Sequence, residues 1–264
     1  MTYFGFLLRF LVIPILVFLV ITWWDNKNNR PTFGFNNGKP VWVAILIHIV
    51  LAVVYTTPWD NYLVATGVWY YNPNLVTGIV IGYVPIEEYT FFVLETILAG
   101  LWWWFLARRI PEPTNTFKPN KTGRIISFSV LFIFWVIFTY LFFFGDVELT
   151  YLSIILFWAF PAIFPQMLYG ADILWHYRKL VFITIFVPGL YLSLMDIIAL
   201  TDTTWSISKE QTTGILFFNI LPLEEVLFFF ITNVLIGFGM TLLLSKLGTQ
   251  RFEDWKSNNY KGLP

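Results

Sequence analysis

The sequence predicts an all-α polytopic membrane protein with about seven transmembrane helices and two parallel internal repeats. Of its 264 residues, 58% are hydrophobic and only 12% are charged, whereas a soluble domain carries about a quarter charged residues. Apolar runs of roughly membrane-spanning length recur from one end of the chain to the other. In addition, residues 55–100 match residues 191–237. The bilayer is therefore the expected solvent, and the cell membrane is the expected location.

Seven apolar segments have approximately the length of about 20 residues that a helix needs to cross a bilayer core. They are Phe4–Trp24, Val41–Thr57, Val76–Leu106, Ile125–Phe144, Tyr151–Tyr169, Leu180–Leu200 and Thr213–Leu244. Each is predicted to form one transmembrane helix, so the two ends of the chain should lie on opposite sides of the membrane.

Lys and Arg gather in alternate connecting segments, at residues 25–40, 107–124 and 170–179, and in the C-terminal tail. These segments hold fourteen of the sixteen cationic residues, and the other two are Arg9 and Lys209. Because cytoplasmic segments carry an excess of Lys and Arg, we expect the N-terminus outside and the C-terminus in the cytoplasm. An odd number of spans agrees with this orientation.

The internal repeat has eleven identical positions and a single one-residue gap. The matched pairs are Tyr55 and Tyr191, Asp60 and Asp196, Trp69 and Trp205, Thr77 and Thr213, Gly78 and Gly214, Pro85 and Pro222, Glu87 and Glu224, Glu88 and Glu225, Phe91 and Phe228, Phe92 and Phe229, and Gly100 and Gly237. An offset of four spans predicts repeats of the same orientation, in which spans 1–3 correspond to spans 5–7. The expected organisation is a first repeat at 1–107, a cytoplasmic linker at 108–124, and span 4 with the second repeat at 125–264.

Each repeat carries a Pro-x-Glu-Glu motif, which contributes Glu87 and Glu88 in span 3 and Glu224 and Glu225 in span 7. About ten residues into a helix, these acids should lie near mid-bilayer, slightly toward the outer side. Inserting an ionised acid there costs roughly 2.5–3.5 kcal/mol, so four such acids indicate a functional role. A neutral acid beside a carboxylate is the arrangement that general acid–base catalysis needs. We predict that all four are catalytic, and that each motif proline kinks its helix.

Two phenylalanines follow each motif one helical turn later, on the same face as its second glutamate. They are Phe91, Phe92, Phe228 and Phe229. Aromatic faces stabilise a cation without offering it a nucleophile, and the chain holds 29 Phe, 13 Trp and 13 Tyr. We therefore expect these four side chains to bind substrate. A dry acid in an aromatic chamber suits protonation of a carbon–carbon double bond.

Three further acids are candidate site residues. Asp60 and Asp196 are a matched pair near the outer ends of spans 2 and 6, where they could also cap a helix or face water. Glu95 lies one to two turns beyond the first motif, and Thr232 takes its place in the second repeat. The structural alternative for all of these acids is hydrogen bonding to backbone freed by proline, or pairing between helices. The absence of cysteine and the presence of only two histidines argue against a metal site.

The two motifs, Pro-Ile-Glu-Glu-Tyr-Thr-Phe-Phe at 85–92 and Pro-Leu-Glu-Glu-Val-Leu-Phe-Phe at 222–229, resemble the paired motifs of the membrane-integral lycopene cyclases. Through span number, repeat and motif position, the resemblance covers nearly the whole chain, and it is to the single fused form without a phytoene synthase domain. It implies a lycopene β-cyclase, in which an acid protonates a terminal double bond, the cation closes a ring, and a base removes a proton. The product would be β-carotene, formed by way of γ-carotene.

The resemblance also implies a lipid-soluble carotenoid as substrate, with membrane lipid and other carotenoid-pathway enzymes as partners. No Gly-x-Gly-x-x-Gly fingerprint is present, so no flavin or other cofactor is implied. A net charge of zero argues against nucleic acid as a partner. At position 95, where related sequences often carry Gln, this chain departs from the family pattern.

Other functions remain open at this stage. A cyclase of another carotenoid or ring type shares the same features, and a proton-coupled transporter would suit parallel repeats with midplane acids, although few polar residues could line an aqueous path. An intramembrane protease with a Glu-Glu-x-x-x-Arg motif is excluded because Phe92 and Phe229 replace the arginine. We expect the four glutamates to face one shared chamber, and the alternative is two independent sites, one for each end of the carotenoid.

Overall fold

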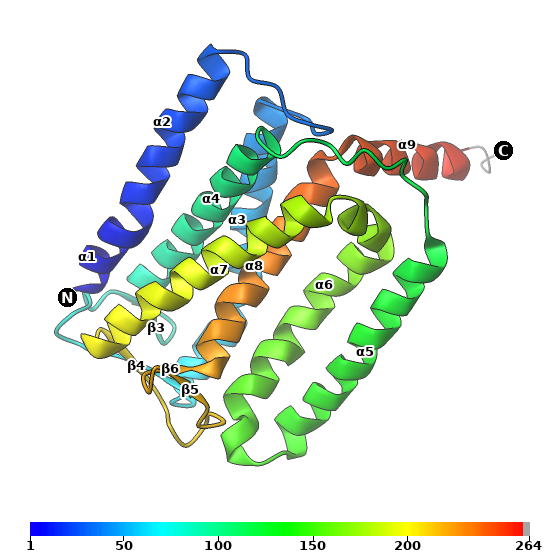
Figure 1. The fold of residues 1–264 in the computed structure, drawn as a ribbon. Helices are drawn as coiled ribbons and strands as arrows, with labels where there is room; N and C mark the ends of the chain where they lie inside the picture. The colour runs from blue at the N-terminus through cyan, green and yellow to red at the C-terminus, as the bar shows by residue number, and fades with distance from the viewer. Residues whose placement is uncertain (261–264) are drawn as a thin grey trace.

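The computed structural model describes residues 1–260 of the chain. Within them, helices dominate, and seven helical stretches are long and apolar enough to cross a membrane, which confirms the predicted all-α membrane class (Figure 1). The α-helices are α1 (Tyr3–Leu7), α2 (Ile13–Lys27), α3 (Lys39–Ala65), α4 (Ile86–Ala107), α5 (Lys121–Phe144), α6 (Thr150–His176), α7 (Arg178–Thr201), α8 (Leu223–Leu244) and α9 (Lys246–Tyr260). A π-helical turn (Leu8–Val12) joins α1 to α2, and a 3-10 turn (Val147–Leu149) precedes α6.

Helices α4 and α8 occupy the interior of the bundle. Helix α4 packs against α2, α3, α7 and α8, while α8 also packs against α3, α6 and α7. Helix α5 lies at the periphery beside α6, and α9 leaves the bundle at the end opposite the N-terminus (Figure 1). The two helices that begin with the glutamate motifs are therefore the ones best shielded from lipid.

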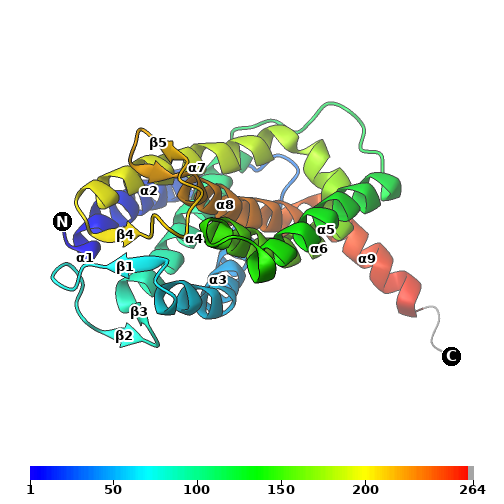
Figure 2. The ribbon, with the colours of Figure 1, turned by 90° about the horizontal axis from the view of Figure 1, so that it is seen from below.

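Short strands that the sequence did not predict lie at the end of the bundle that carries the N-terminus (Figures 1 and 2). Within residues 1–260 they are β1 (Trp69–Tyr71), β2 (Val80–Ile81), β3 (Val84–Pro85), β4 (Trp205–Ile207), β5 (Leu216–Phe217) and β6 (Leu221–Pro222). The pairs β2–β3 and β5–β6 are tight hairpins, whereas β1 pairs with β4 in an antiparallel register. The β1–β4 pair joins the segment after α3 to the segment after α7 and covers this end of the bundle.

The starts of α4 and α8 correct the predicted spans. Both helices begin directly after the motif prolines, Pro85 and Pro222, and not about ten residues earlier. Proline suits a helix start because the missing N–H has no partner there. The preceding residues turn instead, and Gly78 and Gly214 both have positive φ, of +79° and +72°. The predicted kink is therefore wrong, and the glutamates lie in the first helical turn and not midway along a helix.

Two hydrogen bonds made by matching tyrosines agree with the predicted repeat. The repeat itself stays a prediction. The hydroxyl of Tyr55 donates to the Trp158 carbonyl at 2.7 Å, and its counterpart Tyr191 donates to the Phe10 carbonyl at 2.9 Å. The second bond has a local cause. Pro14 cannot donate to the Phe10 carbonyl, so Tyr191 of α7 satisfies this acceptor at the π-helical turn.

An ion-pair network ties the helix ends opposite the β1–β4 pair. The Asp25 carboxylate at the end of α2 accepts two hydrogen bonds from Arg109, at 2.9 and 3.1 Å, and lies 3.7 Å from the Arg108 guanidinium. Arg108 is 1% exposed. Burial lowers the pKa of its guanidinium, and the neighbouring Asp25 carboxylate counteracts this effect. The pairing holds α2 against the C-terminal end of α4.

Candidate active site

A small cavity lies between the N-terminal turns of α4 and α8, with residues of β1 and β4 in its wall. The second glutamate of each motif, Glu88 and Glu225, lines it together with Asp196 of α7. All three side chains are buried. The structure therefore brings acids from both halves of the chain to one enclosed space.

Glu88 is held by two tyrosine hydroxyls. Tyr3 of α1 and Tyr71 of β1 both donate to its Oε2 atom, at 2.5 and 3.0 Å. Burial and the Glu88 carboxylate raise the pKa of the Tyr71 hydroxyl well above its usual range. Tyr71 therefore keeps its proton and acts as a hydrogen-bond donor to Glu88.

Glu225 has a different set of partners. Within residues 1–260 its Oε1 atom accepts one hydroxyl, from Tyr151 of α6 at 2.6 Å. The neighbouring acid Asp196 accepts the indole N–H of Trp205 at 2.8 Å. Trp205 lines the cavity and Tyr151 does not, and their hydrogen bonds fix the acids of this half in position as well.

The first glutamate of each motif has different contacts from the second. The carboxyl groups of Glu87 and Glu224 are buried, and each accepts the backbone N–H of a threonine, Thr77 at 2.6 Å and Thr213 at 2.7 Å. Neither belongs to the cavity wall. Adjacent residues of an α-helix point about 100° apart because a turn holds 3.6 residues. The structure thus differs from the expectation of four glutamates around one chamber, since these two fasten the β2–β3 and β5–β6 hairpins.

Asp60 lies behind the cavity wall. It is 0% exposed, and among the described residues neither carboxylate oxygen has a hydrogen-bond partner. It therefore does not face water, and neither does the buried Asp196. Asp60, Asp196 and Glu225 are each close enough to Glu88 to interact with it electrostatically. The site is a cluster of four acidic groups, of which three border the cavity.

Glu95 lies further along α4, away from the cavity. Its carboxyl group is buried and accepts the hydroxyl of Thr232 on α8 at 2.7 Å. Thr232 is the residue that replaces it in the second repeat. This hydrogen bond joins the two central helices, which matches the structural alternative for an intramembrane acid.

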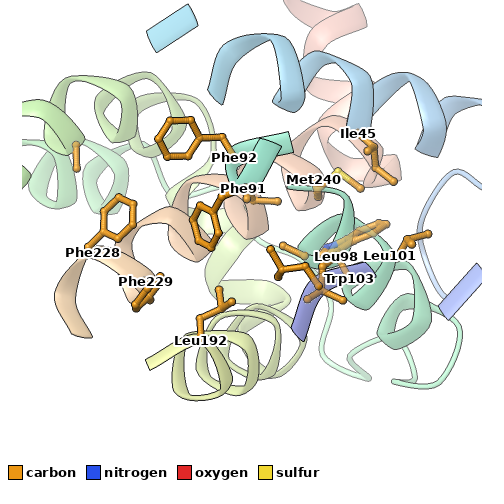
Figure 3. Close-up of a cluster of buried hydrophobic side chains, with 14 of the residues drawn as sticks. Ile45, Phe91, Phe92, Leu98, Leu101, Trp103, Leu192, Phe228, Phe229 and Met240 are labelled. Carbon is orange, nitrogen blue, oxygen red and sulfur yellow. The ribbon is translucent and has the colours of Figure 1, made fainter. Parts of the chain in front are cut away.

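Aromatic side chains form most of the apolar wall. Phe91, Phe228 and Phe229 line the cavity, and Figure 3 shows them grouped with Leu192. Phe92 is buried beside Phe91 and does not reach the cavity wall. Trp59 stacks on Phe228 from behind, at 5.4 Å between ring centroids. The wall places π faces beside the acids, and π faces attract a cation.

Sequence reasoning did not find the three tyrosines that hold the catalytic candidates, Tyr3, Tyr71 and Tyr151. Tyr3 and Tyr151 begin the first and fifth spans, outside the stretch in which identities reveal the repeat. Trp205 carries a signal, because it matches Trp69 in the repeat, but this match does not reveal its hydrogen bond to Asp196. Side chains from four separate elements meet here, and one-dimensional spacing does not show that.

Known proteins resemble the chain over most of its length. It is 38% identical over 201 residues to the lycopene beta-cyclase of Halobacterium salinarum, which covers 74% of this chain and 80% of that protein. It is 30% identical over 203 residues to the bifunctional lycopene cyclase/phytoene synthase of Aspergillus oryzae and 33% identical over 201 residues to that of Podospora anserina. These matches cover 76% and 74% of this chain but only 34% of each fungal protein. No family model and no solved structure matches the chain.

Proposed function

Since the chain belongs to the lycopene cyclase family, we propose that it closes the linear ends of lycopene into β-ionone rings. The observation that carries this proposal is the single cavity that Glu88 and Glu225 share inside an aromatic wall. The relative from Halobacterium salinarum is named a lycopene beta-cyclase. Its similarity extends over 74% of this chain.

Ring closure needs a proton donor, a stabilised cation and a proton acceptor. One of Glu88 and Glu225 protonates the terminal double bond, and the tertiary cation that forms is attacked by a double bond further along the chain. The other carboxyl group removes a proton to leave the ring alkene, so no electrons are gained or lost. The faces of Phe91, Phe228 and Phe229 stabilise the cation. The buried wall also excludes water, which would otherwise capture it.

The two motifs form one site in this proposal. Glu88 and Glu225 open into the same cavity, so each end of the carotenoid enters in turn. Glu87 and Glu224 position the hairpins, and Asp60 and Asp196 complete the acidic cluster. Glu88→Gln or Glu225→Gln should therefore slow the first and second closures alike. Accumulation of the one-ring product in either variant would support two independent sites.

The membrane arrangement is a further part of the proposal. The Lys- and Arg-rich segments connect helix ends at the side opposite the cavity, which favours a cytoplasmic C-terminus and an external N-terminus in the cell membrane. Apolar residues of α5 are exposed along its length, for example Ile126, Ile133 and Phe144, so membrane lipid covers this helix. Other enzymes of carotenoid synthesis are the expected partners, because substrate and product both stay in the bilayer.

The test is pigment chromatography in a bacterial host that accumulates lycopene and expresses the chain. Conversion of red lycopene to a yellow bicyclic product is expected, and the retention time identifies the ring type. The matched control is Glu225→Gln, with both proteins quantified in the membrane fraction. Unchanged lycopene in cells whose membranes contain the wild-type chain would contradict the proposal.

A further inference from the structure

The cavity glutamates of the two halves accept different numbers of hydroxyl hydrogen bonds. Two hydroxyls, from Tyr3 and Tyr71, donate to one oxygen of Glu88. Within residues 1–260, Glu225 accepts one hydroxyl, from Tyr151. Tyr3 and Tyr151 play equivalent parts, since each begins a span and donates to the glutamate of its own half. In hydroxyl donors, the two halves therefore differ by the hydroxyl of Tyr71.

The sequence repeat shows where this difference originates. Trp69 at the start of β1 matches Trp205 at the start of β4, so Tyr71 corresponds to Ile207. Both Tyr71 and Ile207 line the cavity. At this position, the first half places a hydrogen-bond donor where the second half places an apolar side chain.

Hydrogen bonds of this kind favour one protonation state. An ionised carboxylate accepts hydrogen bonds and donates none, so two hydroxyl donors on one oxygen stabilise the ionised form of Glu88. The high pKa of the Tyr71 hydroxyl keeps that donor in place. Within residues 1–260, Glu225 accepts a single hydroxyl, so hydroxyl donors stabilise its ionised form less than that of Glu88.

From this asymmetry we infer that Glu225 is the proton donor, that Glu88 is the proton acceptor, and that Tyr71 is the positioning residue that distinguishes them. The assignment rests on the proposed cyclase function and deepens it. If it is correct, a change at the proton donor and a change at the proton acceptor should have different effects on the products.

The proton balance of one closure follows from these roles. The Glu225 O–H bond breaks and a C–H bond forms at the terminal alkene, which leaves a tertiary cation. The electrons of the internal double bond form the ring C–C bond, and the charge moves to a ring carbon. Glu88 then takes a proton from the adjacent carbon, and that C–H pair becomes the ring double bond. Glu225 is left ionised and Glu88 protonated, so one proton returns from Glu88 to Glu225 before the next closure.

The position of the base decides which alkene forms. The ring cation can lose a proton from the carbon that carries the polyene, which gives a β ring, from the ring methylene, which gives an ε ring, or from the methyl group, which gives an exocyclic alkene. Two hydroxyls fix the Glu88 carboxylate and so select one of these protons. Loss of the Tyr71 hydroxyl should loosen this selection, whereas loss of the Tyr151 hydroxyl should not.

The experiment compares three variants in the lycopene-accumulating host, with ring types separated by chromatography and the chain quantified in membranes. Tyr71→Phe should give a mixture in which the share of ε and exocyclic rings rises about tenfold or more, the effect of one hydrogen bond to a charged group. Its counterpart Tyr151→Phe should lower lycopene conversion by a similar factor while the rings stay β. Tyr70→Phe is the matched control in the same strand, because Tyr70 is 53% exposed, and it should match the wild type.

The inference is overturned if Tyr71→Phe makes only β rings, or if Tyr151→Phe is the variant that mixes ring types. Where a Tyr variant fails to reach the membrane, Glu88→Gln and Glu225→Gln decide the matter. The residual product of Glu88→Gln should contain mixed rings, and that of Glu225→Gln only β rings, and any other pattern refutes the assignment. Failure of the proposed function is distinguishable, because the wild-type chain would then leave lycopene unchanged.

Discussion

Replacing Glu87 by Gln tests whether the two glutamates of a motif have separate roles. Glu87 accepts the backbone N–H of Thr77 at 2.6 Å and lies outside the cavity wall, whereas Glu88 lines it. The side-chain carbonyl of Gln can still accept this N–H. The β2–β3 hairpin should therefore keep its place over the start of α4, and the cavity should keep its shape.

The expected magnitudes of the two substitutions differ widely. A hydrogen bond to a charged carboxylate contributes about 1.5–3 kcal/mol, against about 0.5–1.5 for a neutral one. An acid in the first helical turn adds about 0.3–1 kcal/mol through the helix dipole. Glu87→Gln thus costs about 1–2 kcal/mol of stability, and we expect cyclase activity to remain within about tenfold of wild type. Glu88→Gln removes a reacting group, and we expect a loss of about 10²- to 10⁴-fold.

The assay measures the rate of bicyclic product formed from lycopene in isolated membranes, normalised to the amount of folded chain. Glu224→Gln is the matched variant in the second half, because Glu224 accepts the N–H of Thr213 in the same way. A Glu87→Gln chain that is present in normal amount, unfolds at a normal temperature and is as inactive as Glu88→Gln would refute the division of roles.

Further predictions concern packing, charge and orientation. A Cβ on Gly239 would lie 2.0 Å from Nε2 of His48, so Gly239→Ala should lower stability by about 1–3 kcal/mol. Gly237→Ala should lower stability less, because the nearest atom to its Cβ would be 3.1 Å away. Equal unfolding temperatures of the two variants in detergent would contradict both expectations. Asp25→Asn leaves the buried Arg108 without its carboxylate and should cost about 3 kcal/mol, which an unchanged unfolding temperature would disprove. A green fluorescent protein fused to the C-terminus should fluoresce and an alkaline phosphatase there should be inactive, and the reverse result would invert the proposed orientation.

The number of spans could be predicted because burial in lipid leaves a strong compositional signal, but the helix starts could not. The residues before Pro85 are as apolar as the helix that follows, so hydropathy alone extends span 3 through them. The evidence for a later helix start lay in two individual glycines. Gly78 and Gly82 both adopt positive φ, a conformation that turns need and that a helix does not allow. A proline preceded by two glycines indicates a helix start more strongly than it indicates a kink.

The candidate site was also predictable only in part. The repeated motif identified Glu88 and Glu225, but the helix register was needed to separate them from Glu87 and Glu224. Tyr3, Tyr71 and Tyr151 could not be assigned, because α1, β1 and α6 bring them to Glu88 and Glu225 only through tertiary packing. Their hydroxyls also have no partner that sequence spacing would reveal.

Acid–base chemistry explains why a site made from two similar halves has to be asymmetric. The proposed reaction needs one protonated and one ionised carboxyl group at the start of each closure, and identical surroundings would give both groups the same preference. The cavity shows two departures from symmetry. Tyr71 lines the cavity at the position that Ile207 takes in the other repeat, and Asp196 has a donor in Trp205 whereas Asp60 has none among the described residues. Both departures distinguish the surroundings of Glu88 from those of Glu225. Two copies of one motif can therefore supply both the proton donor and the proton acceptor that one ring closure requires.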